Sequence, residues 1–185
     1  MNRAATSILV LAPLLVSCGP RQPPAAAPAE DVAPAAENAA LGLRVTELPE
    51  GIRMAGNEGD RLVFDAASDG VPGNLLIGVG PPVLAGINLA AEANGFGERA
   101  AASGGKFFGG NQIVTPYGSG YVARVLGGDG MEEIRVFLLH PGDSDRLLTV
   151  SLGYPPGGPE VSRARMNQVI ELLGALEPLD APAAE

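Results

Sequence analysis

Alternating apolar and polar residues mark several short segments along the middle of the chain. Side chains of a strand point alternately to opposite faces of a sheet, so a half-buried strand shows this two-residue period. Clusters of Gly, Pro, Asn and Asp separate the segments and mark turns. The predicted strands are residues 43–47, 61–65, 75–79, 106–114, 120–126, 133–139 and 147–154, with residues 52–54 as a short continuation of the first.

Two segments have the three- and four-residue spacing of a helix instead. The first is residues 83–102, where alanine is dense and the apolar positions are Leu84, Ile87, Ala91 and Phe96. The second is residues 160–176, with an apolar side formed by Met166, Val169, Ile170, Leu173 and Leu176. Its polar side holds Arg163, Asn167, Gln168 and Glu171. Pro159 and Glu160 suit the start of this second helix.

Strands joined by short turns, with helices in the middle and at the end, are typical of an antiparallel sheet with helices packed on it. We therefore predict a single α+β domain over residues 41–179, with about six to seven strands and two main helices. A domain of about 140 residues is long enough to bury one ordinary core.

The order of these segments resembles that of the PsbP/Mog-type α/β sandwich family. The likeness rests on an opening Val45-Thr46-Glu47-Leu48-Pro49-Glu50-Gly51, a mid-chain helix, hairpin strands ending in residues 121–126 and 134–139, a strand ending Leu152-Gly153-Tyr154-Pro155 and a closing amphipathic helix. It covers nearly all of residues 41–179 and is one of pattern and order. The family includes photosystem assembly or cofactor-retention subunits and GTPase-binding proteins, so the resemblance implies a non-enzymatic binding module. A fold alone does not fix a function.

The beginning of the chain has the pattern of an export signal. A basic segment ending at Arg3 precedes an uncharged apolar run over residues 4–16, which is too short for a membrane-spanning helix of about 20 residues. The run ends Leu15-Val16-Ser17-Cys18, which resembles the lipobox of bacterial lipoproteins. This resemblance implies that residues 1–17 are cleaved off and that Cys18, the single cysteine, is acylated. An ordinary secretory signal with an incidental cysteine is the alternative.

The following residues, 18–40, are rich in Ala and Pro and lack an apolar period that could form a core. We predict a disordered tether there and a disordered tail at residues 180–185. Acyl chains on Cys18 would anchor the protein, because each buried methylene contributes about 0.8 kcal/mol. The predicted location is the bacterial cell envelope, facing the periplasm or the cell surface. Gly19 favours the outer membrane, because an Asp at that position favours inner-membrane retention in proteobacterial lipoproteins.

Charge and cysteine content exclude some classes of partner. The 185 residues carry a formal net charge of −9, which repels phosphate backbones and argues against nucleic-acid binding. A single cysteine allows neither an intrachain disulfide nor a thiolate metal cluster. The sequence predicts no cofactor.

The single histidine lies in His140-Pro141-Gly142-Asp143-Ser144-Asp145. His140 with Asp143 and Asp145 could offer one nitrogen and two carboxylates to Ca²⁺ or a transition metal ion. The same residues also make a good hairpin turn between two strands, which is the interpretation we favour. We therefore predict no metal site, and these three residues stay weak candidates for a metal or small-ligand carrier.

Three further motifs have two interpretations each. Ser119, between two glycines, lacks the spacing of a nucleophile elbow, so a turn is favoured over a hydrolase using Ser119 with His140 as its base. Glu132 and Glu133 are adjacent in a strand, so they point to opposite faces, and we expect them to be solvated. In Phe107-Phe108 we expect at least one ring in the core, with an exposed binding wedge as the alternative.

An anchored domain without a recognisable catalytic set favours a non-catalytic interaction or assembly module. Its predicted partners are the lipid bilayer, through Cys18, and another envelope protein.

Overall fold

The computed structural model describes residues 35–83 and 86–179. The predicted signal, Cys18, the first part of the predicted tether, Leu84 and the tail at residues 180–185 lie outside the described residues. Within the described part, no helix combines the length and the apolar character needed to cross a membrane.

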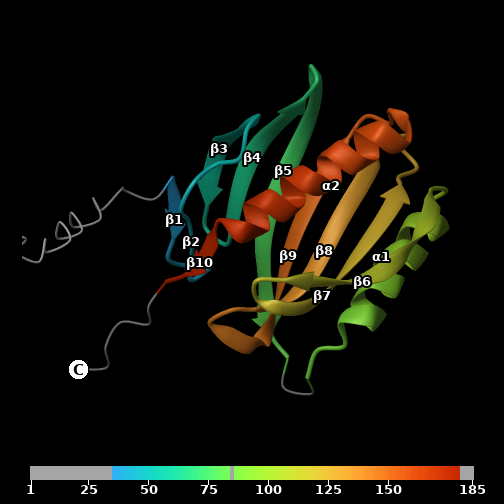
Figure 1. Ribbon diagram of the computed structural model, residues 1–185. Coiled ribbons are helices and arrows are strands. Elements are labelled where there is room, and N and C mark those ends of the chain that lie inside the picture. Colours follow the sequence, from blue (N-terminus) through green and yellow to red (C-terminus); the bar gives the residue numbers. More distant parts are fainter. Residues whose placement is uncertain (1–34, 84–85, 180–185) are drawn as a thin grey trace, which may run out of the picture. The chain divides into compact units, whose positions relative to one another are not determined.

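Seven antiparallel strands form the main sheet (Figure 1). Their order is β3-β4-β5-β9-β8-β7-β6, so β3 and β6 lie at its two edges. The strands span Ile52–Glu58 (β3), Arg61–Ser68 (β4), Val71–Pro82 (β5), Lys106–Thr115 (β6), Gly118–Leu126 (β7), Glu132–His140 (β8) and Asp143–Tyr154 (β9). The predicted antiparallel sheet is confirmed, and residues 52–54 begin a strand of this sheet rather than continuing an earlier one.

A second sheet of three antiparallel strands joins the beginning and the end of the described chain. Its order is β1-β2-β10, formed by Ala36–Asn38, Leu43–Val45 and Leu176–Pro178. The strand predicted at residues 43–47 therefore belongs to this small sheet. The predicted tether is wrong at its end, because backbone pairing with β2 and burial of Ala36 and Asn38 give residues 36–38 a fixed structure.

The two helices pack on opposite faces of the main sheet (Figure 1). α2, Gly158–Gly174, shares the larger core with the small sheet and with residues such as Phe64, Ile77 and Val150. α1, Leu89–Ala102, lies on β6, β7 and β8 and shares a smaller core with Val125 and Phe137. The predicted α+β arrangement with two helices is thus confirmed. α1 begins at Leu89 rather than at residue 83, because Asn88 caps it: its Oδ1 accepts a hydrogen bond from the amide of Ala91 at 3.1 Å.

The buried side of α2 differs from the predicted apolar side. Ile170 is 50 % exposed, whereas Gln168, predicted on the polar side, is buried, and so is Arg165. Gln168 Nε2 donates to the carbonyl oxygen of Ala67 at 2.8 Å, and Arg165 Nη1 donates to Gln168 Oε1 at 2.9 Å. Polar side chains on the core side of α2 thus fasten the helix to the end of β4, which a hydrophobic period does not reveal.

Candidate functional site

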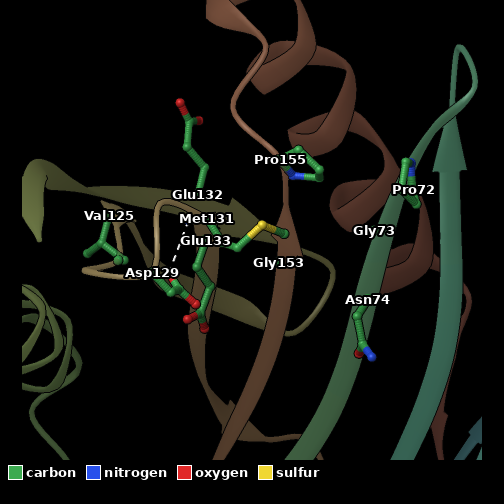
Figure 2. Close-up of a pocket in the computed structure, with 11 residues that line it drawn as sticks. Pro72, Gly73, Asn74, Val125, Asp129, Met131, Glu132, Glu133, Gly153 and Pro155 are labelled. Carbon is green, nitrogen blue, oxygen red and sulfur yellow. Dashed lines mark hydrogen bonds between the residues drawn. The ribbon is translucent and has the colours of Figure 1, made fainter.

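A cavity of about 530 Å³ lies at one end of the main sheet, where β5, β9, β8 and β7 run side by side (Figure 2). Its apolar walls include Val125, Met131 and the two prolines Pro72 and Pro155. Its polar side chains include those of Asn74, Asp129 and Glu133. We call it the Gly153 cavity, after the glycine on its floor. Its volume is within the range of about 300–1,000 Å³ that is usual for ligand sites.

Strand register explains why a cavity forms here. Val125, Glu133, Gly153 and Asn74 are successive partners across β7, β8, β9 and β5, so their side-chain positions share one face of the sheet. This is the face on which α1 packs, because Val125 belongs to the α1 core. A Cβ added to Gly153 would come no closer than 4.0 Å to a non-neighbouring atom, the carbonyl oxygen of Asn74. Because Gly153 has no side chain, the face of the sheet is unfilled between the side chains of Glu133 and Asn74.

The cavity is acidic, because its lining residues include Asp129, Glu132 and Glu133 but no Lys or Arg. Asp129 Oδ1 accepts a hydrogen bond from the amide of Met131 at 3.0 Å, which fixes the turn between β7 and β8. Glu133 Oε1 accepts hydrogen bonds from Nε and Nη2 of Arg135 at 2.9 and 2.6 Å. Arg135 also lies over the Phe96 ring of α1, with 4.2 Å between its Cζ and the ring centroid. These contacts use one oxygen of each carboxylate.

Glu132 points away from Glu133, toward the α2 side of the sheet (Figure 2). Its Oε2 accepts hydrogen bonds from the hydroxyls of Tyr154 at 2.9 Å and Ser162 at 3.0 Å. The expectation that both glutamates are solvated is therefore wrong for Glu132, because two buried hydroxyls bind it; their opposite directions are confirmed. Burial, together with Glu132, raises the pKa of Tyr154 to about 12.

His140 is buried at the end of β8, directly before the turn that leads to β9. Its Nε2 lies 2.7 Å from the carbonyl oxygen of Leu41, and its Nδ1 accepts a hydrogen bond from the amide of Gly142 at 3.1 Å. Both bonds together require a neutral ring with the proton on Nε2, and burial lowers the pKa of His140. Asp143 Oδ1 accepts a hydrogen bond from the amide of Asp145 at 3.1 Å, as in a turn.

These hydrogen bonds bear directly on the metal candidates His140, Asp143 and Asp145. Both ring nitrogens already have partners, so the ring has no free nitrogen to coordinate an ion. Over residues 35–83 and 86–179, no group of three or more His, Cys, Asp or Glu side chains is placed to hold a metal ion. The hydrogen bonds of His140 and Asp143 therefore support the interpretation of this segment as a hairpin turn.

Ser119 lies exposed on β7, opposite Val114 of the neighbouring strand. His140 bonds to Leu41 and Gly142 and not to Ser119, so the ring is not placed as a general base for that hydroxyl. The two residues therefore do not form the pair that a hydrolase would need.

Sequence reasoning missed the Gly153 cavity. One local feature could have pointed to it: an isolated glycine inside a strand pattern is a known sign of an irregularity or a close approach. The neighbours that make Gly153 a floor, Glu133 and Asn74, come from other strands and follow only from the register.

No known family model and no curated protein matches this chain. Solved structures similar to it include a mutant of the protein Mog1, with 13% identity over 76% of this chain and 92% of that chain, at a TM-score of 0.49. The Saccharomyces cerevisiae Ran-binding protein Mog1p has 12% identity over 75% and 91%, at a TM-score of 0.49. The cyanobacterial PsbP (CyanoP) from Synechocystis has 12% identity over 74% and 86%, at a TM-score of 0.47. The likeness concerns the overall arrangement, in line with the predicted PsbP/Mog-type sandwich, and carries no argument about binding or activity.

Proposed function

We propose that this protein is a lipid-anchored module of the bacterial cell envelope, and that its domain binds a segment of a partner protein in the Gly153 cavity without catalysing a reaction. The observation that carries the proposal is the open position at Gly153, walled by apolar side chains and bordered by Asp129 and Glu133. The anchor itself rests on the sequence Leu15-Val16-Ser17-Cys18.

The chemistry of the cavity suits a basic side chain of the partner. Val125, Met131 and Pro155 offer apolar surface for the aliphatic part of a lysine or arginine, whose charged end seeks polar surroundings. Asp129 and Glu133 each keep one carboxylate oxygen outside the hydrogen bonds described above. A cationic group hydrogen-bonded to these oxygens would form the stronger, charge-assisted type of bond.

The roles of the acidic residues support binding rather than catalysis. Asp129 fixes a turn, and Glu133 holds Arg135 against α1. Both carboxylates are therefore parts of the wall, and the wall is already in place before a partner arrives. Such preorganisation favours affinity, because less freedom is lost on binding.

A small-ligand carrier is the second candidate, and the cavity volume favours it. It would use the same cavity but would bind a free cationic molecule instead of a protein segment. His140 takes no part in it, because its two nitrogens are engaged.

Mass spectrometry of the protein purified from its native host tests the anchor. We expect a mature chain that begins at an acylated Cys18, and a Cys18→Ser variant that appears in the soluble fraction. A chain that keeps Met1, or a Cys18 with an unmodified thiol, would refute the anchor.

An NMR titration tests the cavity with blocked tripeptides Val-Arg-Leu, Val-Lys-Leu, Val-Gln-Leu and Val-Glu-Leu and the ¹⁵N-labelled mature chain carrying Cys18→Ser. We expect the Arg and Lys peptides to shift the amide signals of Asn74, Met131 and Gly153. The Gly153→Leu variant should bind at least about tenfold more weakly, because its side chain fills the open position.

Gly78→Leu is the matched control. A Cβ there meets only Thr149 Oγ1 at 3.7 Å and Leu76 Cδ2 at 3.9 Å, and Gly78 lies outside the cavity lining. Equal binding of the Arg and Glu peptides, or binding that Gly153→Leu leaves unchanged, would refute the cavity as a site for basic side chains.

A further inference from the structure

The edge strand β6 is the second surface with features of a binding site. Among the described strands, β7 alone pairs with it, so its outer edge has no strand beside it. Gly110, Asn111 and Gln112 are three exposed residues in succession, and Val114 is 89 % exposed. An edge strand presents unpaired backbone N–H and C=O groups, to which an extended segment of another protein can add as a further strand.

The hairpin formed by β6 and β7 differs in charge from the rest of the protein. Residues 106–126 contain Lys106 and Arg124 but no Asp or Glu, whereas the whole chain carries a net charge of −9. Within the described part of the chain, neither cation makes an ion pair. We call this segment the basic hairpin. Its charge complements that of an acidic partner and opposes that of the Gly153 cavity.

Phe108 organises the two cations at the surface. Lys106 Nζ lies 5.1 Å and Arg124 Cζ lies 4.5 Å from the centroid of its ring, both within cation–π range. The ring is itself 39 % exposed, while Phe107 packs against Gly97 of α1. Phe107 thus packs, partly buried, against the α1 core, as expected for one of the two rings, and Phe108 is exposed at the surface.

The flank of α2 extends this surface. A shallow cavity of about 210 Å³ lies between Phe108, Arg124 and Met166 of α2. Arg163 and Ile170 lie three residues before and four residues after Met166, so they share its side of the helix. The surface next to β6 thus combines exposed apolar side chains with cations.

We propose that β6 accepts an extended acidic segment of a partner protein as an additional strand of the main sheet. Carboxylates of that segment pair with Lys106 and Arg124, and an apolar side chain of it contacts Phe108. This surface is distinct from the Gly153 cavity, because it has the opposite charge and lies next to Met166 of α2, whereas the cavity lies on the α1 face of the sheet. Only β7 contributes to both, through Arg124 and Val125. Nucleic acid is disfavoured by the charge of the protein, and a bilayer would not use the backbone groups of the edge.

Fluorescence anisotropy tests the proposal with a labelled, blocked eight-residue peptide that alternates Glu and Val. The comparison peptides alternate Lys and Val, or carry N-methyl groups on alternate amides of the Glu-Val sequence. We expect the Glu-Val peptide to bind the mature chain carrying Cys18→Ser and to shift the amide signals of β6 in NMR spectra. The Lys-Val and N-methylated peptides should bind at least about tenfold more weakly, because the first carries the opposite charge and the second lacks backbone N–H donors.

Charge reversal supplies the matched variants. Lys106→Glu with Arg124→Glu should weaken binding at least about tenfold, whereas Arg53→Glu with Arg61→Glu, on β3 and β4, changes the net charge equally and should have little effect. NMR spectra confirm that each variant is folded. Equal weakening by both pairs, equal binding of the N-methylated peptide, or binding to anionic phosphatidylglycerol vesicles in place of the peptide would overturn the proposal. Gly153→Leu should leave binding of the Glu-Val peptide intact, so the proposals for β6 and for the Gly153 cavity are tested separately.

Discussion

Arg165 lies over the ring of Tyr154, with 5.7 Å between its Cζ and the ring centroid, and both side chains are completely buried. Instead of a carboxylate, the guanidinium group meets carbonyl oxygens: Nη1 donates to Ala66 at 3.3 Å, and Nη2 donates to Val71. Burial lowers the pKa of Arg165. Val71 precedes Pro72, which lines the Gly153 cavity, so this contact ties α2 to one wall of the candidate site.

Replacing Arg165 should therefore destabilise the domain strongly. Arg165→Ala removes the donors for two carbonyl oxygens and leaves a void in the core, and we expect a loss of about 3 kcal/mol in the free energy of unfolding. Arg165→Met fills the void without restoring the donors, so it should cost less. Urea unfolding followed by circular dichroism measures both variants; an Arg165→Ala protein as stable as the wild type would show that these bonds contribute nothing.

The raised pKa of Tyr154 predicts that the free energy of unfolding decreases at alkaline pH. The unfolded tyrosine ionises at its ordinary pKa of 10.0, and the folded one at about 12. Between these values the unfolded state has already lost the proton that the folded state keeps, so the free energy of unfolding decreases as the pH rises. Tyr154→Phe should show a shallower decrease when urea unfolding is compared at about pH 9 and about pH 11. An identical decrease in both proteins would assign the effect to other groups.

The lowered pKa of His140 predicts that the free energy of unfolding decreases in mild acid as well, this time as the pH falls. Because burial lowers its pKa below the ordinary value of 6.5, the unfolded ring gains a proton before the folded ring does. Stability should therefore fall as the pH decreases below about 6.5. His140→Gln, which keeps a donor for the carbonyl oxygen of Leu41 but does not titrate, should show a smaller fall. NMR titration of the ring gives the folded pKa directly, and a value at or above 6.5 would contradict this account.

The hairpins of the main sheet could be predicted because their information is local. Residues 120–126 and 133–139 alternate clearly, and a short turn rich in glycine and acidic residues separates them. The pairing of Leu43–Val45 with Leu176–Pro178 has no such local sign, since the two segments come from opposite ends of the domain. Each is also too short to have a distinct period of its own.

The buried polar side chains and the Gly153 cavity were harder to place from the sequence. Gln168 and Arg165 are buried because backbone carbonyl oxygens of β4 and β5 accept their hydrogen bonds, and a polar residue type gives no hint of such partners. Glu132 is buried for a similar reason, with Tyr154 and Ser162 as donors. The Gly153 cavity depends on a register across four strands, which no single segment contains.

Site-specific crosslinking in the native host tests partner binding at the Gly153 cavity most directly. Benzoylphenylalanine in place of Met131, at the cavity wall, should give a discrete covalent adduct, whereas the same group in place of Asp60, at the exposed turn before β4, should not. The adduct should disappear in the Gly153→Leu variant and persist in Gly78→Leu. An adduct that Gly153→Leu leaves unchanged, or no adduct from position 131, would contradict the proposal that a partner binds there.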